Sequence, residues 1–165
     1  MKGYRTSLIC SLLLFVLILF VSCTSREENV KTFLSKRGYT VESYCGKVEE
    51  YVLSEELLKD KVYSLQWQSQ AVDFKEYFRD KIEVEKLIVR NHPLDNWKAE
   101  PLVVKNVDGN IIYNKENNMV SKGKTEIYLF IARNKIVGGR SFPVLDQHML
   151  GDYEMIWTID GVRKN

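Results

Sequence analysis

The chain has 165 residues, of which 45% are hydrophobic, with 24 basic and 22 acidic side chains. Two of the basic residues, Lys2 and Arg5, precede Cys23, so the 143 residues from Cys23 onward carry 22 charges of each sign. Balanced charge argues against binding to nucleic acid, which needs a basic patch or stripe for its phosphates. Balanced charge also provides no polybasic attraction to anionic lipid. The length of the chain is that of one ordinary domain.

The first 23 residues have the pattern of an export signal. Lys2 and Arg5 are followed by an apolar run over residues 8–21, and the composition becomes polar directly after Cys23. A cationic start, a short apolar segment and a small residue at its end are typical of a cleaved signal peptide. The alternatives are an uncleaved anchor and simple secretion. The 16 residues at 7–22 are fewer than the roughly 20 that an untilted helix needs to cross a bilayer.

The junction Phe20-Val21-Ser22-Cys23 resembles the lipobox of bacterial lipoproteins, with Phe20 where Leu is usual. The resemblance implies cleavage before Cys23, palmitate-type acylation of Cys23, and attachment to the outer face of the cell membrane. It divides the chain into a signal peptide (1–22), a tether (23–29) and a domain (30–165). Two embedded acyl chains hold far better than one, because each buried CH2 contributes about 0.8 kcal/mol.

The domain is predicted to begin with a helix over residues 26–37. Val30, Phe33 and Leu34 form one apolar stripe, and Gly38 can adopt the left-handed conformation of a helix cap. We expect this helix to pack on a sheet. The next segments are predicted as strands at 39–44, 48–53 and 62–67, with Gly46 between the first two, a short helix at 55–59 after Ser54, and a helical turn at 74–79.

The strongest strand signal is at residues 126–132, which are apolar on both faces and predict a central strand. A tight turn at Arg133-Asn134 follows, and Gly138-Gly139 is predicted to end the returning strand. Alternation over residues 153–159 predicts another strand, with Trp157 in the core. The remaining predicted segments are a strand at 82–90 with a phase shift at 87–89, a hairpin of 102–107 with 110–113 around Asp108-Gly109, and a polar loop at 114–123.

These elements predict the fold class. Several short strands follow an N-terminal helix without regular strand–helix alternation, which indicates an α+β domain with the helix packed on a mainly antiparallel sheet. Cys45 is the only thiol after Cys23, so we expect no disulfide within the domain and interpret Cys45 as a small, partly buried structural residue rather than as a reactive nucleophile.

No catalytic, metal-binding or cofactor motif is present, and no cofactor is predicted. His92 with Asp95, and His148 with Asp146 and Asp152, could contribute metal ligands, but each set is far short of a site. Solvated or locally hydrogen-bonded loops are the preferred interpretation.

Specific polar residues gather at 66–70 and 91–95. We expect His92 and Asp95, with Gln68 or Gln70, to form one exposed binding patch, stiffened by Pro93. The alternative is that His92 and Asp95 cap the end of the strand at 82–90. Trp67 is interpreted as a core residue rather than as part of a sugar- or peptide-binding surface.

Four segments of the domain resemble small uncharacterised lipoproteins of Gram-positive bacteria: Gly38-Tyr39, residues 91–95, residues 137–143 and Asp160-Gly161. The resemblance implies an α+β fold and an envelope location, without an activity. The primary hypothesis is a lipid-anchored binding or interaction module with an envelope protein, peptide or glycan as partner. The alternatives are an envelope hydrolase or metal-dependent enzyme using His92 or His148, and a pheromone-like peptide released from residues 15–22.

Overall fold

The computed structural model describes residues 26–99, 102–105, 111–115, 119–145 and 156–164. The chain divides into two compact units, Met1–Arg37 and Gly38–Asn165. The predicted signal peptide, Cys23, the predicted turn at Asp108-Gly109, and residues 146–155, which include Asp146, His148 and Asp152, lie outside the described residues. In the first unit a helix covers residues 26–35, with Val30 and Leu34 buried.

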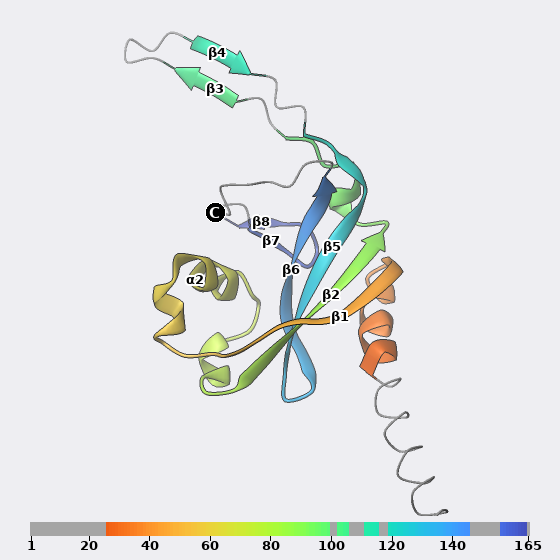
Figure 1. Cartoon of the computed structure of the whole chain (residues 1–165), viewed down its shortest axis with the longest axis vertical. Coiled ribbons are helices and arrows are strands. Elements are labelled where there is room, and N and C mark those ends of the chain that lie inside the picture. The colour runs from red at the N-terminus through yellow and green to blue at the C-terminus, as the bar shows by residue number, and fades with distance from the viewer. Residues whose placement is uncertain (1–25, 100–101, 106–110, 116–118, 146–155, 165) are drawn as a thin grey trace, which may run out of the picture. The chain divides into compact units, whose positions relative to one another are not determined.

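The second unit is an α+β domain built on an antiparallel sheet. Among the described residues, six strands form this sheet in the order β1-β2-β5-β6-β7-β8, and the four longest run side by side in Figure 1. The strands are β1 (Thr40–Val52), β2 (Lys81–Arg90), β5 (Ser121–Ala132), β6 (Lys135–Leu145), β7 (Ile156–Thr158) and β8 (Arg163–Lys164). A separate hairpin pairs β3 (Leu102–Lys105) with β4 (Ile111–Lys115).

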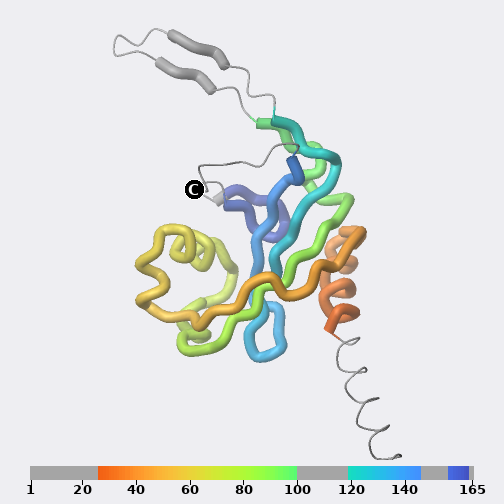
Figure 2. Tube along the Cα trace, viewed as in Figure 1, coloured from red at the N-terminus to blue at the C-terminus, as the bar shows by residue number. Residues whose placement is uncertain are grey.

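β5 is the central strand, as predicted. It pairs with β2 and β6, and Ile127, Leu129, Phe130, Ile131 and Ala132 are all buried. The β2–β5 register is uninterrupted, and the register shifts between β1 and β2 come from extra residues on β1, so the phase shift in the β2 sequence reflects burial on both faces rather than a bulge in β2 itself. Figure 2 shows the turn that reverses the chain between β5 and β6; its residues Arg133 and Asn134 have φ of 49° and 59°.

A helix, α2 (Lys61–Gln68), forms where the sequence predicted a strand at residues 62–67. Asp60 caps it by accepting hydrogen bonds from the amides of Val62 at 2.8 Å and Tyr63 at 3.2 Å. α2 turns three side chains inward, Tyr63, Gln66 and Trp67. Their spacing is that of a helix, whereas the predicted strand rested on alternating residues.

Trp67 lies in the hydrophobic core, where it is fully buried. Its ring is 5.4 Å from that of Phe130, and the cluster continues through Leu53, Ile82 and Val84. The interpretation of Trp67 as a core residue is therefore confirmed. Trp157 is also buried, with an exposed fraction of 5%.

Gly46 and the Gly138-Gly139 pair do not end strands. β1 continues through Gly46, whose φ of 77° accompanies a register shift against β2, a local bulge. β6 continues through both later glycines. A Cβ on Gly138 would lie 2.3 Å from Gln70 Oε1, and one on Gly139 would lie 2.5 Å from the Tyr128 carbonyl oxygen, so the glycines admit close neighbours rather than stop the strand.

The short 3-10 helices agree better with the sequence. η1 (Leu57–Lys59) begins after Ser54, whose hydroxyl accepts from the Leu57 amide at 3.2 Å, and η2 (Phe74–Tyr77) falls at the predicted helical turn. The predicted loop at 114–123 is wrong at both ends, because β4 extends to Lys115 and β5 begins at Ser121.

Candidate functional site

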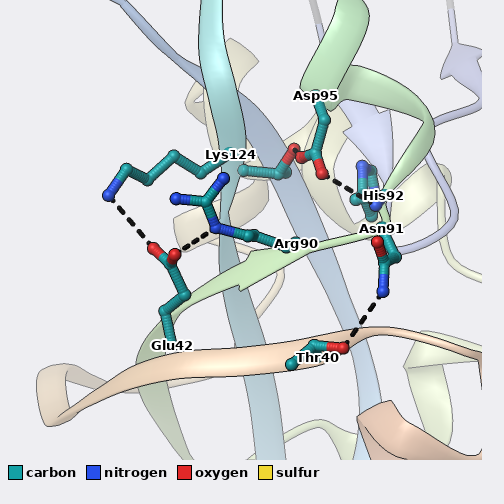
Figure 3. A network of polar contacts seen from close by, with 8 residues as sticks. Thr40, Glu42, Arg90, Asn91, His92, Asp95 and Lys124 are labelled. Atoms are coloured by element: carbon teal, nitrogen blue, oxygen red, sulfur yellow. Dashed lines mark hydrogen bonds and ion pairs between the residues drawn. The ribbon is translucent and has the colours of Figure 1, made fainter.

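His92 and Asp95 cap a short 3-10 helix, η3 (Pro93–Asn96), at the end of β2. The Leu94 amide donates to His92 Nδ1 at 3.1 Å. The His92 amide donates to Asp95 Oδ2 at 3.1 Å (Figure 3). The other Asp95 oxygen accepts from the Thr125 hydroxyl at 2.7 Å. This reciprocal arrangement is the capping box, so both side chains satisfy local backbone groups.

His92 is buried, with an exposed fraction of 3%. Because its Nδ1 accepts a backbone hydrogen bond, its Nε2 carries the proton and donates to the Ile159 carbonyl oxygen at 2.8 Å. Burial lowers the pKa of His92, while the hydrogen bond to Ile159 and the carboxylates of Asp95 and Asp160 act in the opposite direction. The ring is thus held neutral with both nitrogens in use.

The two glutamines of the predicted patch have separate partners. Gln68 is exposed and donates to the Ser64 hydroxyl at 2.9 Å, whereas Gln70 accepts from the Gly139 amide at 2.8 Å and so joins the end of α2 to β6. Within the described part of the chain, no hydrogen bond links either glutamine to His92 or Asp95.

The exposed position expected for His92 is therefore wrong, and the alternative, a cap at the end of β2, is what the structure shows. The physical reason is local. The first turn of η3 leaves backbone amides without an intrahelical partner, and the ring of a histidine before proline can accept a hydrogen bond from one of them. A partner-binding role for the four residues stays a prediction.

A charged network lies next to this cap. Glu42 on β1 accepts from Arg90 on β2 and from Lys124 on β5, and Asn91 reaches across to Thr40 at 3.1 Å (Figure 3). The hydrogen bonds from Arg90 and Lys124 lower the pKa of Glu42. The carboxylate is fully compensated by its neighbours, so this network ties strand ends together.

A second polar arrangement crosses the middle of the sheet and is the candidate site. Lys86 on β2, Tyr128 on β5 and Arg140 on β6 are successive cross-strand neighbours and therefore share one face. Lys86 Nζ lies 5.4 Å, and Arg140 Cζ 5.1 Å, from the centroid of the Tyr128 ring. We call these three partly exposed side chains the cation row.

Glu126 and Phe142 lie beside the cation row, in the next cross-strand pair of the same face. Glu126 accepts from Lys86 at 2.7 Å and, through its other oxygen, from the Tyr128 hydroxyl at 2.8 Å. Burial and then the Glu126 hydrogen bond raise the pKa of Tyr128. Burial alone would lower the pKa of Lys86, but its bonds to Glu126 and Tyr128 outweigh burial and raise it.

Phe142 completes an aromatic wall. Its ring is in edge contact with Tyr128 at 5.9 Å and with Trp157 at 6.1 Å, and Trp157 in turn meets Trp97 at 5.8 Å. The Arg140 guanidinium lies 5.5 Å from the Phe142 centroid. Arg140 is thus placed against two aromatic faces, which favours a cation at this position.

Gln66 connects the cation row to α2. Its Oε1 accepts from Arg140 Nη1 at 2.6 Å, and its Nε2 donates to the Tyr51 hydroxyl oxygen at 3.3 Å. The Trp67 indole also donates to that oxygen, at 3.1 Å. Burial raises the pKa of Tyr51, and a hydrogen bond to Glu49 is the main cause that raises the pKa of Tyr63 to about 12.

The site can recognise a ligand by charge, hydrogen bonding and aromatic contact. Within the described ranges, no group of three or more His, Cys, Asp or Glu residues could hold a metal ion.

Cys45 is a free and exposed thiol, so its prediction as a partly buried structural residue is wrong in exposure.

Sequence inspection missed the cation row because its members are far apart in the chain. In the sequence, Gln66 is only one of the polar residues at 66–70, next to Trp67. A pattern that could have indicated the cation row is a charged or aromatic residue on the same face of each of three strands. Recognising that pattern requires the strand register.

No known protein family, curated protein or solved structure matches this chain. None of the helices in the described ranges is both long and apolar enough to span a bilayer.

The structure predicts a pH dependence of stability from His92. Its pKa is lowered by folding from about 6.5, so the folded state binds fewer protons there than the unfolded state. The stabilisation is complete above the unfolded pKa and is lost as pH falls toward the folded pKa. Urea midpoints of the wild type should therefore decrease between pH 7.5 and 5.5 more than those of His92→Asn, in which the amide oxygen can still accept from Leu94.

His148→Asn serves as the control and should keep the wild-type dependence, because it removes the other histidine of the chain. An unchanged pH dependence in His92→Asn would contradict the assignment of a neutral His92 in the folded state. Each pKa unit of difference between the two states corresponds to about 1.4 kcal/mol of unfolding free energy.

Proposed function

We propose that this protein is a lipid-anchored binding module on the outer face of the cytoplasmic membrane. The location rests on the sequence: a cationic start, a short apolar run and a Cys directly after Ser22. The lipid supplies the membrane attachment, because the balanced charge of the remaining chain gives no electrostatic attraction to the bilayer.

The observation that supports binding is the cation row. Charged and aromatic side chains occupy the middle of one sheet face, where Lys86 and Glu126 retain side-chain exposures of 25% and 27%. A sheet face that served only as core would place apolar residues there, as it does under α2 at Ile82 and Val84. A surface of cations, hydroxyls and aromatic rings suits an envelope peptide, glycan or protein as partner.

The enzyme alternative receives no comparable support from His92. A metal ligand or general base needs a ring nitrogen that is free to coordinate or to accept a proton. Both nitrogens of His92 are engaged, by the Leu94 amide and by the Ile159 carbonyl. His148 lies outside the described residues.

We further propose that the helix at residues 26–35 packs on the sheet domain through its apolar stripe. Val30, Phe33 and Leu34 form one apolar stripe, which a helix of a folded domain buries against another element. The lipid-linked tether would then lead directly into a fixed element of the domain.

Leu34→Ala tests this packing. It should lower the unfolding free energy of the whole domain by about 2–5 kcal/mol, since it removes buried methyl groups and leaves a cavity. Exposed Lys36→Ala is the control and should change stability by less than about 0.5 kcal/mol. Equal stability of the two variants in denaturant melts would show that the helix does not pack on the domain.

Cys23→Ala tests the anchor. Cells fed an alkyne-tagged palmitate should label the wild-type protein, and Cys23→Ala should lose the label, because its acceptor thiol is absent. Cys45→Ala should keep the label. Retained labelling of Cys23→Ala would refute lipidation at this residue.

Binding through the cation row is tested by photo-cross-linking in living cells. Benzoyl-phenylalanine at Ile88, which neighbours Glu126 across the strands, should form adducts with an envelope component. The same group at exposed Lys135, the first residue of β6, should form none. Failure of the Ile88 position to cross-link in a folded, membrane-attached protein would overturn the proposed binding face.

A further inference from the structure

The hydrogen bonds around Gln66 have a determined direction. Arg140 is only a donor, so its 2.6 Å partner on Gln66 must be the amide oxygen. The amide nitrogen of Gln66 therefore faces Tyr51 and donates to it at 3.3 Å. The Trp67 indole is also only a donor, so the Tyr51 oxygen accepts two hydrogen bonds.

This direction leaves donors in excess. With its oxygen accepting from Gln66 and Trp67, the Tyr51 hydroxyl still has its own proton to donate, and none of the described residues accepts it. Arg140 has five N–H groups, of which one is hydrogen-bonded to Gln66 within the described residues. The buried Arg140 Nε has no acceptor among them.

The positive charge of Arg140 is also uncompensated within the described part of the chain. Glu126 uses one oxygen for Lys86 and the other for Tyr128. Glu49, the carboxylate near Tyr51, accepts from the Tyr63 hydroxyl at 2.6 Å and forms no ion pair with Arg140. A partly buried guanidinium whose hydrogen-bond partner among the described residues is a neutral amide is costly without an anion.

Resting on the binding function proposed above, we propose that Arg140, with the Tyr51 hydroxyl that Gln66 holds beside it, binds an oxyanion. Lys86 and Glu126 pair with each other at 2.7 Å, which leaves Arg140 as the cation without a carboxylate in ion-pair contact among the described residues. A guanidinium fork matches carboxylate and phosphate oxygens, and Phe142 offers an apolar contact to the body of the ligand. The two sources of this chemistry in an envelope ligand are a carboxylate and a phosphodiester.

The test is an NMR titration of the full-length chain in an uncharged detergent. The Trp67 indole N–H donates to Tyr51, so its signal reports on the Tyr51 hydroxyl; it is assigned among the three tryptophans with Trp67→Phe. The probes are benzoate, diphenyl phosphate and neutral benzamide. At least one anion should shift the Trp67 signal saturably, and its identity distinguishes the carboxylate from the phosphodiester.

Benzamide should bind about tenfold more weakly or not at all, since it cannot neutralise Arg140. Arg140→Gln should weaken the anion about tenfold or more, whereas Lys135→Gln, an equal loss of charge at the first residue of β6, should leave its Kd unchanged. If Arg140→Gln does not fold, the comparison of benzoate with benzamide on the wild type decides. Equal affinity for benzamide, or no saturable shift with either anion, overturns the oxyanion site.

The two proposals fail separately. Cross-linking at Ile88 with no anion dependence in the titration keeps the binding face and removes the oxyanion. Saturable anion binding without an adduct at Ile88 keeps the oxyanion site and removes the proposed partner interaction in the cell.

Discussion

The pairing of β5 with β2 on one side and β6 on the other is the constraint on which the rest of the structure depends. Side chains alternate along a strand, so every second residue of β5 lies on one face. From the β6 turn backward, that face carries Ala132 and Phe130 beneath α2, and then Tyr128, Glu126 and Lys124. A one-residue slip would exchange this whole set for the opposite face. Core, candidate site and strand-end network are thus fixed by one register.

Polar residues at the edge of the core make the position of α2 specific. Gln66 is 1% exposed, and an amide buried without partners would cost several kcal/mol. Its partners come from β1 and β6, so the amide is satisfied only when α2 lies over the sheet in one orientation. Gln70 likewise joins the end of α2 to the sheet, by accepting a hydrogen bond from the Gly139 amide. A side chain at Gly139 would clash with its neighbours. These contacts add orientation to a core that apolar burial stabilises.

The same geometry that orders α2 leaves a surplus of donors at its edge. In a structural network the charges compensate one another, as around Glu42, where two cations flank one carboxylate. The Arg140 environment differs, because the acceptor that the described residues supply is a neutral amide. Local rules thus separate a network that ties strands together from one suited to an external anion.

The amino-acid sequence by itself determined the features that depend on neighbouring residues. The apolar run before Cys23, the strand at 126–132, the turn at Arg133-Asn134 and the α+β class follow from local composition and periodicity. Such signals act over a few residues, and no distant partner is needed to form them.

Only the tertiary structure decided the rest. The helix at 61–68 was predicted as a strand, because a short segment with Val62, Leu65 and Trp67 fits both periods and its burial partners lie on other strands. From the sequence, His92 is expected to be an exposed loop residue. In the fold its Nε2 is buried and hydrogen-bonded to the carbonyl oxygen of Ile159. The cation row requires a register between three strands, and that register exists only once pairing has brought residues far apart in sequence to one face. Contacts of that range are set by the packing of the whole domain, which local periodicity does not encode.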